Sequence, residues 1–151
     1  MHQRWFRAFP AIGVFGLAGL MIGGPSAGAG VRAATARPTI YMAAQASAGA
    51  KIYDTTCAAC HGAQLEGNVG PALVGHNLVV LAKNTKLTVG DLFGFMALQM
   101  PLKEPGSLKH GQYVAVMAYI LKRNGYPAGH KALTYGGAMN SKVIMTSYGA
   151  K

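Results

Sequence analysis

Three stretches of the chain carry apolar residues at the three- and four-residue spacing of a helix face: residues 48–57, 88–100 and 108–123. In the first stretch, Gly49, Ile52 and Tyr53 share one face. In the second, Thr88 precedes Asp91 by three residues, which is the pattern of a capping box and predicts the start of a helix. The third carries a wide apolar stripe, as expected of a helix packed on a core.

The predicted helices end at residues that do not continue a helix. Pro101 disfavours helical geometry at Met100, so the second helix is predicted to end there and to leave Met100 on an extended exit. Asn124 and Gly125 follow the third helix and favour its termination. The pattern therefore predicts an all-α fold.

The N-terminus has the layout of an export signal, predicted to cover residues 1–29. Two arginines open it, an uncharged run follows, and Ala27-Gly28-Ala29 has the small-x-small form of a cleavage site. A later cut, after Ala36, is also compatible with the sequence. The uncharged run is long enough for a membrane span of about 20 residues, but its glycines and Pro10 weaken it as a helix, so cleavage is favoured over a retained anchor.

The remaining chain divides by composition into three parts. Residues 30–45 are small and polar and are predicted to form a linker. Residues 46–125 hold the helical patterns and form the predicted domain. Residues 126–151 are rich in Gly, Ala, Tyr and Lys without periodicity, and are predicted to be an extended C-terminal tail.

The charge is strongly one-sided, with 14 Lys and Arg against 4 Asp and Glu in 151 residues. This balance suits docking to an acidic protein surface or to anionic lipid. The basic residues are scattered and no nucleic-acid motif is present, which argues against nucleic-acid binding. So few acids also leave little material for an active site built on paired carboxylates.

The strongest chemical signal is Cys57-Ala58-Ala59-Cys60-His61, the pattern of covalent c-type haem attachment. In a helical turn, the two sulfurs reach the two vinyl carbons of one porphyrin, and His61 is held beneath the ring to bind the iron. A thioredoxin-type dithiol would need a βαβ setting, which is not apparent. A structural zinc site would need four ligands, and a disulfide here would enclose only two alanines.

The second axial ligand decides the function, because a saturated iron suits electron transfer and an open one permits chemistry on small molecules. Met100 is the candidate, since it lies 39 residues after His61 and directly precedes Pro101. Met96 and Met117 fall on apolar faces, where methionine more often fills the core.

On these residues, together with Gly70-Pro71-Ala72-Leu73, the chain resembles a class I cytochrome c over about residues 46–125. The segment from Met100 to Pro127 is similar to cytochrome c domains that serve bacterial quinoprotein dehydrogenases. The resemblance implies three to five short helices around one covalently bound haem, ligated by His61 and Met100.

The resemblance also implies roles for residues around the haem. The Pro71 carbonyl would accept a hydrogen bond from His61, which would fix the imidazole. Leu73, Leu92 and Phe95 would line the haem face. Gly49 and Tyr53 would lie where the first helix crosses the last.

We therefore expect a periplasmic, single-haem electron carrier that is not itself an enzyme. Its expected partners are acidic redox proteins, with a dehydrogenase as donor and an oxidase or another cytochrome as acceptor. Lysines such as Lys83, Lys103 and Lys109 would ring the haem edge.

Two alternatives stay open at this point. One is a permanent haem subunit of a dehydrogenase complex, docked by tail residues Tyr126, Tyr135 and Tyr148 and held at the membrane through its partner or an uncleaved N-terminus. The other is an open-site haem enzyme or gas sensor, in which no methionine would bind the iron.

Overall fold

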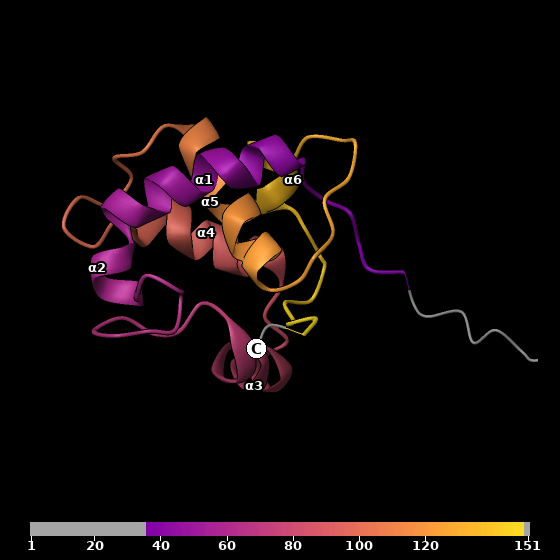
Figure 1. Ribbon diagram of the computed structural model, residues 1–151, viewed down its shortest axis with the longest axis horizontal. Helices are drawn as coiled ribbons and strands as arrows, with labels where there is room; N and C mark the ends of the chain where they lie inside the picture. Colours follow the sequence, from indigo (N-terminus) through magenta and orange to yellow (C-terminus); the bar gives the residue numbers. More distant parts are fainter. Residues whose placement is uncertain (1–35, 150–151) are drawn as a thin grey trace, which may run out of the picture. The chain divides into compact units, whose positions relative to one another are not determined.

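Six helices occur in the part of the chain that the computed structural model describes, residues 36–149 (Figure 1). They are α1 (Ala43–Thr56), α2 (Ala58–His61), α3 (Gly75–Thr85), α4 (Val89–Gln99), α5 (His110–Arg123) and α6 (Tyr135–Met139). No strand occurs among these residues, so the predicted all-α class is confirmed. The predicted export signal, residues 1–29, lies outside the described residues. Within residues 36–149, no helix has the length and apolar character needed to cross a membrane.

The crossing of α1 over α5 is the central packing contact (Figure 1). Gly49 lies at the crossing, where a Cβ atom would overlap the Ala115 carbonyl and lie 2.9 Å from the Val116 nitrogen. One turn later the ring of Tyr53 packs on that of Tyr119, with centroids 5.3 Å apart. The crossing predicted for Gly49 and Tyr53 is therefore present.

Both predicted ends of α4 are present. The Thr88 hydroxyl accepts a hydrogen bond from the Asp91 amide at 3.0 Å, and the Asp91 carboxylate accepts one from the Thr88 amide at 2.9 Å. Side-chain and backbone hydrogen bonds from Thr88 hold the pKa of Asp91 below its usual value. At the other end Met100 leaves the helix with φ −120° and ψ 153°, the extended exit that Pro101 favours.

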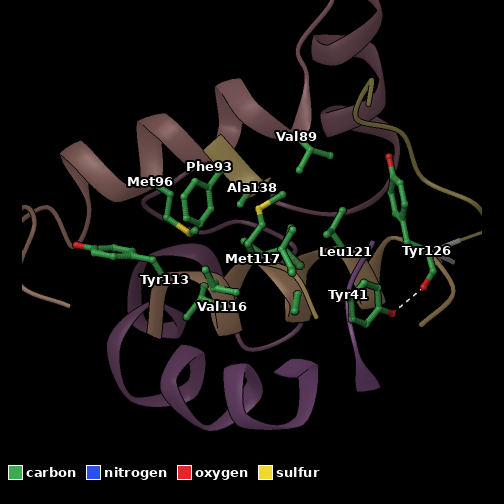
Figure 2. Packing of buried hydrophobic residues seen from close by; sticks show 14 of the residues in the cluster. Tyr41, Val89, Phe93, Met96, Tyr113, Val116, Met117, Leu121, Tyr126 and Ala138 are labelled. Carbon is green, nitrogen blue, oxygen red and sulfur yellow. Dashed lines mark hydrogen bonds between the residues drawn. The ribbon is translucent and has the colours of Figure 1, made fainter. Parts of the chain in front are cut away.

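One part of the core lies between α4, α5 and α6. Figure 2 shows Phe93 and Met96 of α4 beside Met117 and Val116 of α5, with Ala138 of α6 completing the cluster. All five side chains are at most 9% exposed. A second group lies at the far end of the same cluster.

That second group joins the segment before α1 to the segment after α5. The Tyr41 hydroxyl donates to the Tyr126 carbonyl at 2.7 Å, and the Gly129 amide donates to the Tyr41 carbonyl at 2.8 Å (Figure 2). The Gln45 side chain exchanges two hydrogen bonds with the backbone of Leu133. Because α1 already begins at Ala43, the predicted boundary between linker and domain, at residues 45 and 46, falls inside a helix.

Residues 126–149 are not the extended tail that the sequence predicts. They contain α6, which raises the helix count of the described chain above the predicted three to five. Leu133, Ala138 and Met145 are buried. The backbone is also paired, since the Val89 amide donates to Val143 at 2.7 Å and the Met145 amide donates to Leu87 at 2.9 Å.

The tyrosines of this segment turn inward instead of forming the exposed docking strip considered above. Tyr126 is 2% exposed and donates its hydroxyl to the Ile144 carbonyl at 3.0 Å. Tyr148 packs edge-on against Tyr126, and Tyr135 packs against Phe93. These aromatic rings anchor the segment to the core.

The buried phenols predict a loss of stability at alkaline pH. Burial raises the pKa of Tyr126 to about 12 and also raises the pKa of Tyr53 and Tyr41. Unfolded tyrosine loses its proton near pH 10, so the free energy of unfolding should fall as pH rises from 10 to 12, by about 1.4 kcal/mol per pKa unit for each phenol. Urea unfolding at pH 8, 10 and 11.5 measures this slope. Tyr126→Phe should make the slope shallower, and an unchanged slope in that variant would contradict the prediction for Tyr126.

Candidate functional site

The motif Cys57–His61 forms one helical turn that continues from the end of α1. The Cys57 carbonyl accepts hydrogen bonds from the amides of Cys60 at 3.1 Å and His61 at 2.9 Å. Gly62, at φ +80°, ends α2, and its carbonyl accepts the Tyr53 hydroxyl at 2.8 Å. Both cysteines are free thiols, one half-buried and one exposed. The turn therefore presents two thiols and the imidazole from one short helix.

Burial and the neighbouring Cys60 raise the pKa of the Cys57 thiol to about 11. A dithiol redox pair depends on a lowered thiol pKa, so this environment argues against that alternative. Among the described residues, no group of three or more His, Cys, Asp and Glu side chains gathers to hold a metal ion. The zinc alternative therefore lacks a ligand set in this part of the chain.

The loop after α2 fixes the orientation of His61. Its Nδ1 lies 2.8 Å from the Pro71 carbonyl oxygen, which can only accept, so Nδ1 carries the proton and Nε2 is left to bind. Gly70 lies against the ring, where a Cβ atom would be 2.9 Å from Cε1. The hydrogen bond that the resemblance implies for Pro71 is therefore present.

The same loop is closed by its own backbone. The Leu73 amide donates to the Leu65 carbonyl, and the Gly70 amide to the Cys60 carbonyl, both at 2.8 Å. Leu65 is fully buried although its φ of +66° is uncommon for a residue with a side chain. The backbone hydrogen bonds therefore hold the loop in a conformation that keeps the Pro71 carbonyl beside Nδ1 of His61.

The backbone of Met100 is held by hydrogen bonds at both its amide and its carbonyl. Its amide donates to the Met96 carbonyl at 3.1 Å, and its carbonyl accepts the Tyr113 hydroxyl at 2.6 Å. The side chain is half-buried, whereas Met96 and Met117 are buried in the core (Figure 2). The backbone of Met100 is therefore fixed while its thioether is not consumed by the core.

A cavity lies beside the C-terminal end of α1. It has a volume of about 510 Å³ and lies between the last residues of α1, Thr55 and Thr56, and the loop that begins at Pro101. Thr56 and Pro101, which are the sequence neighbours of Cys57 and Met100, therefore line the same cavity, although they lie far apart in the sequence.

Several apolar side chains near these elements are incompletely covered. Leu73 and Leu92 are half-buried against the core, while Phe95 is 57% exposed. Leu98 and Leu102 are also exposed, as are Val80 and Leu81 of α3. These apolar side chains offer surface that suits a large apolar group.

These residues fit a covalently bound haem. The thiols are free, Nε2 of His61 is available, Met100 offers a thioether, and Leu73, Leu92 and Phe95 offer apolar surface. Two contributors were not predicted as site residues, namely Arg123 and Asn124 at the end of α5. The sequence indicated only that Asn124 ends a helix, and it gave no signal for Arg123 beyond a cation in the last turn, where cations suit the helix dipole.

The fold and the site define a class I cytochrome c, an electron-transfer protein that carries haem c. The family model described as cytochrome C oxidase, cbb3-type, subunit III matches residues 44–120, which is half of the chain, and the chain belongs to this family. The match includes the attachment motif and Met100.

Among solved structures, the chain is similar to the sulfane dehydrogenase SoxCD from Paracoccus pantotrophus. The identity is 22%, the TM-score is 0.49, and the match covers 66% of this chain and 52% of the other. The chain thus spans about half the length of that relative. No curated protein matches it.

Gly70→Ala is predicted to displace the imidazole of His61. The new methyl group would lie 2.9 Å from Cε1, so the ring must move and the Nδ1–Pro71 hydrogen bond must lengthen. We expect a loss of about 1 kcal/mol in the free energy of unfolding and a shifted ring N–H resonance in the NMR spectrum. Gly136→Ala, where a Cβ atom meets nothing within 4 Å, is the control. An unmoved resonance in Gly70→Ala would contradict the assignment.

Proposed function

We propose that this protein is an exported, single-haem cytochrome c that carries electrons between other redox proteins, with His61 and Met100 as axial ligands. The main support for the proposal is a pair of residues suited to bind iron: His61, whose imidazole is oriented by the Pro71 carbonyl, and Met100, whose backbone carbonyl accepts the Tyr113 hydroxyl. With His61 and Met100 both bound to the iron, the protein would have no open site for a small substrate.

Bound haem would supply an iron that alternates between two oxidation states. The chain supplies the environment. Pro71 holds the His61 proton on Nδ1, and this hydrogen bond makes the ligand more basic. Tyr113 and the last turn of α4 hold the backbone of Met100, and Leu73 and Leu92 would keep water from the apolar face.

Voltammetry of the purified, exported protein tests the proposal. A carrier should give one reversible one-electron response, with one haem per chain by pyridine haemochrome assay. The response should not change when small oxidants such as hydrogen peroxide or nitrite are added. A catalytic current with either compound would favour the enzyme alternative and contradict the proposal.

The expected partner is an acidic redox protein. Lys83, Lys103 and Lys109 are exposed, and Lys103 lines the cavity beside Pro101. Neutralising all three with glutamine should reduce the salt dependence of oxidation by hexacyanoferrate(III), an anionic probe. Lys51→Gln, on the exposed side of α1, is the control. An unchanged salt dependence in the triple variant would contradict electrostatic steering by these lysines.

A second candidate is a permanent subunit of a larger oxidoreductase, and the exposed apolar side chains favour it. Val69 is 86% exposed and Leu102 is 76% exposed, as expected of surface that a partner covers. The matched family is itself described as an oxidase subunit. Native gel electrophoresis of mildly solubilised membranes from the source cell distinguishes the two candidate functions. A permanent subunit should co-migrate with a larger complex, and a free carrier should not.

A further inference from the structure

The C-terminal end of α5 is attached to both ends of the loop that holds His61. Arg123 contacts Gln64, three residues after His61, and Asn124 contacts Leu73, two residues after Pro71. The segment between these attachments contains Gly70 and Pro71, the residues that touch the imidazole.

Asn124 is fully buried. Its Nδ2 donates to the Leu73 carbonyl at 2.8 Å and to the Ile120 carbonyl at 2.9 Å. A buried peptide carbonyl needs a donor, and Asn124 supplies that of Leu73. The amide side chain thereby connects the loop to the last turn of α5.

Arg123 makes the second attachment. Its Nη2 donates to the Gln64 side-chain oxygen at 2.9 Å and to the Gln64 carbonyl at 3.3 Å, while Nη1 donates to the Tyr119 hydroxyl at 3.0 Å. The guanidinium also lies over the Tyr119 ring, 5.8 Å from its centroid. Its planar fork therefore holds the start of the loop in one orientation.

Asn124 is in turn held by the C-terminal segment. Its carbonyl accepts the Tyr148 amide at 2.7 Å, and a side chain at Gly125 would collide with the Tyr148 backbone. Arg37 packs over the Tyr148 ring, 5.1 Å from its centroid. The segment after α5 therefore holds Asn124 in place, and Asn124 in turn holds the loop that contains Pro71.

We propose that Asn124, assisted by Arg123, is a positioning residue for the axial ligand His61. The pair holds the loop so that the Pro71 carbonyl stays within hydrogen-bond distance of Nδ1, which sets the basicity of the imidazole and so the reduction potential. This inference rests on the proposed function, because it requires His61 to bind the iron.

The test uses three variants of the full, haem-loaded chain. Asn124→Leu removes the donor at nearly equal volume, and Arg123→Lys keeps the charge but loses the fork. Tyr41→Phe is the matched control, since it removes one buried hydrogen bond, to the Tyr126 carbonyl, without touching the loop. NMR measures solvent exchange of the His61 ring N–H in the reduced protein, and potentiometry measures the reduction potential.

We expect Asn124→Leu to exchange the ring N–H about tenfold faster and to have a higher reduction potential, since a weaker hydrogen bond makes the histidine a poorer donor to ferric iron. Arg123→Lys should show a smaller change in the same direction and carries the test if Asn124→Leu does not fold. Tyr41→Phe should lose stability without changing either value.

The inference is overturned if the folded Asn124 or Arg123 variants keep the exchange rate and potential of the unmutated protein, or if Tyr41→Phe changes both equally. Failure of the proposed function has a different signature. In that case the unmutated protein itself would lack a histidine-ligated haem spectrum.

Discussion

Gly49→Ala is expected to lower the free energy of unfolding by about 3 kcal/mol or more. The added methyl group would overlap the carbonyl of Ala115, and the next nearest atom is the Val116 nitrogen at 2.9 Å. These are backbone atoms in the middle of α5, so no side-chain rotation relieves the overlap and the two helices must separate. Because small domains have only about 5–15 kcal/mol of stability, such a loss is a large fraction of the total.

Thermal unfolding measures this effect, with an expected fall in Tm of about 10 °C or more. Gly111→Ala is the control, since Gly111 lies in the first turn of α5 and a Cβ atom there meets nothing within 4 Å. That substitution should leave the stability unchanged or raise it by about 0.5–1 kcal/mol, because alanine favours the helix. Equal melting temperatures for the two variants would contradict the close crossing.

Met100→Ala is expected to give the reduced protein a carbon monoxide complex that the unmutated protein does not form. Removing the thioether would leave the position opposite His61 free for an external ligand. If the ligand is displaced in about one molecule in a hundred, its removal raises the apparent affinity for carbon monoxide about a hundredfold. The substitution should also lower the reduction potential, because the Met/His ligand pair raises it.

Visible absorption and carbon monoxide titration measure this change. Met96→Leu is the control, since Met96 lies one turn earlier in α4 and is buried in the core beside Phe93 (Figure 2). A substitution of similar volume there should cost less than about 1.5 kcal/mol and leave the iron closed. If Met96→Leu allows carbon monoxide to bind and Met100→Ala does not, Met96 is the iron ligand and the assignment of Met100 is wrong.

The features that were predictable from the sequence are mostly local. The capping box of Thr88 and Asp91 and the exit at Met100 depend on residues within a few positions of each other. The close crossing at Gly49 depends on a distant helix, and the resemblance supplied that partner.

The C-terminal segment was not predictable because its contacts are with distant parts of the chain and its buried residues follow no regular spacing. Leu133, Ala138 and Met145 are buried one by one at uneven intervals, so they leave no helical or strand period in the sequence. Backbone pairing with Leu87 and Val89 adds contacts that no side-chain pattern records.

The site was predictable to a similar degree. The attachment turn follows from Cys57, Cys60 and His61, whereas the hydrogen bond to Pro71 came from the resemblance and not from spacing. The roles proposed for Arg123 and Asn124 could not be predicted, because a cation and an asparagine at a helix end already satisfy ordinary helix-ending preferences.

The proposed function requires a haem whose two axial positions are both filled by residues of this chain. The visible spectrum of the exported, purified protein, reduced and recorded with and without carbon monoxide, tests it most directly. We expect a c-type spectrum that the gas does not change. A spectrum of the unmutated protein that shifts when carbon monoxide is added, or a protein that carries no haem, would contradict it.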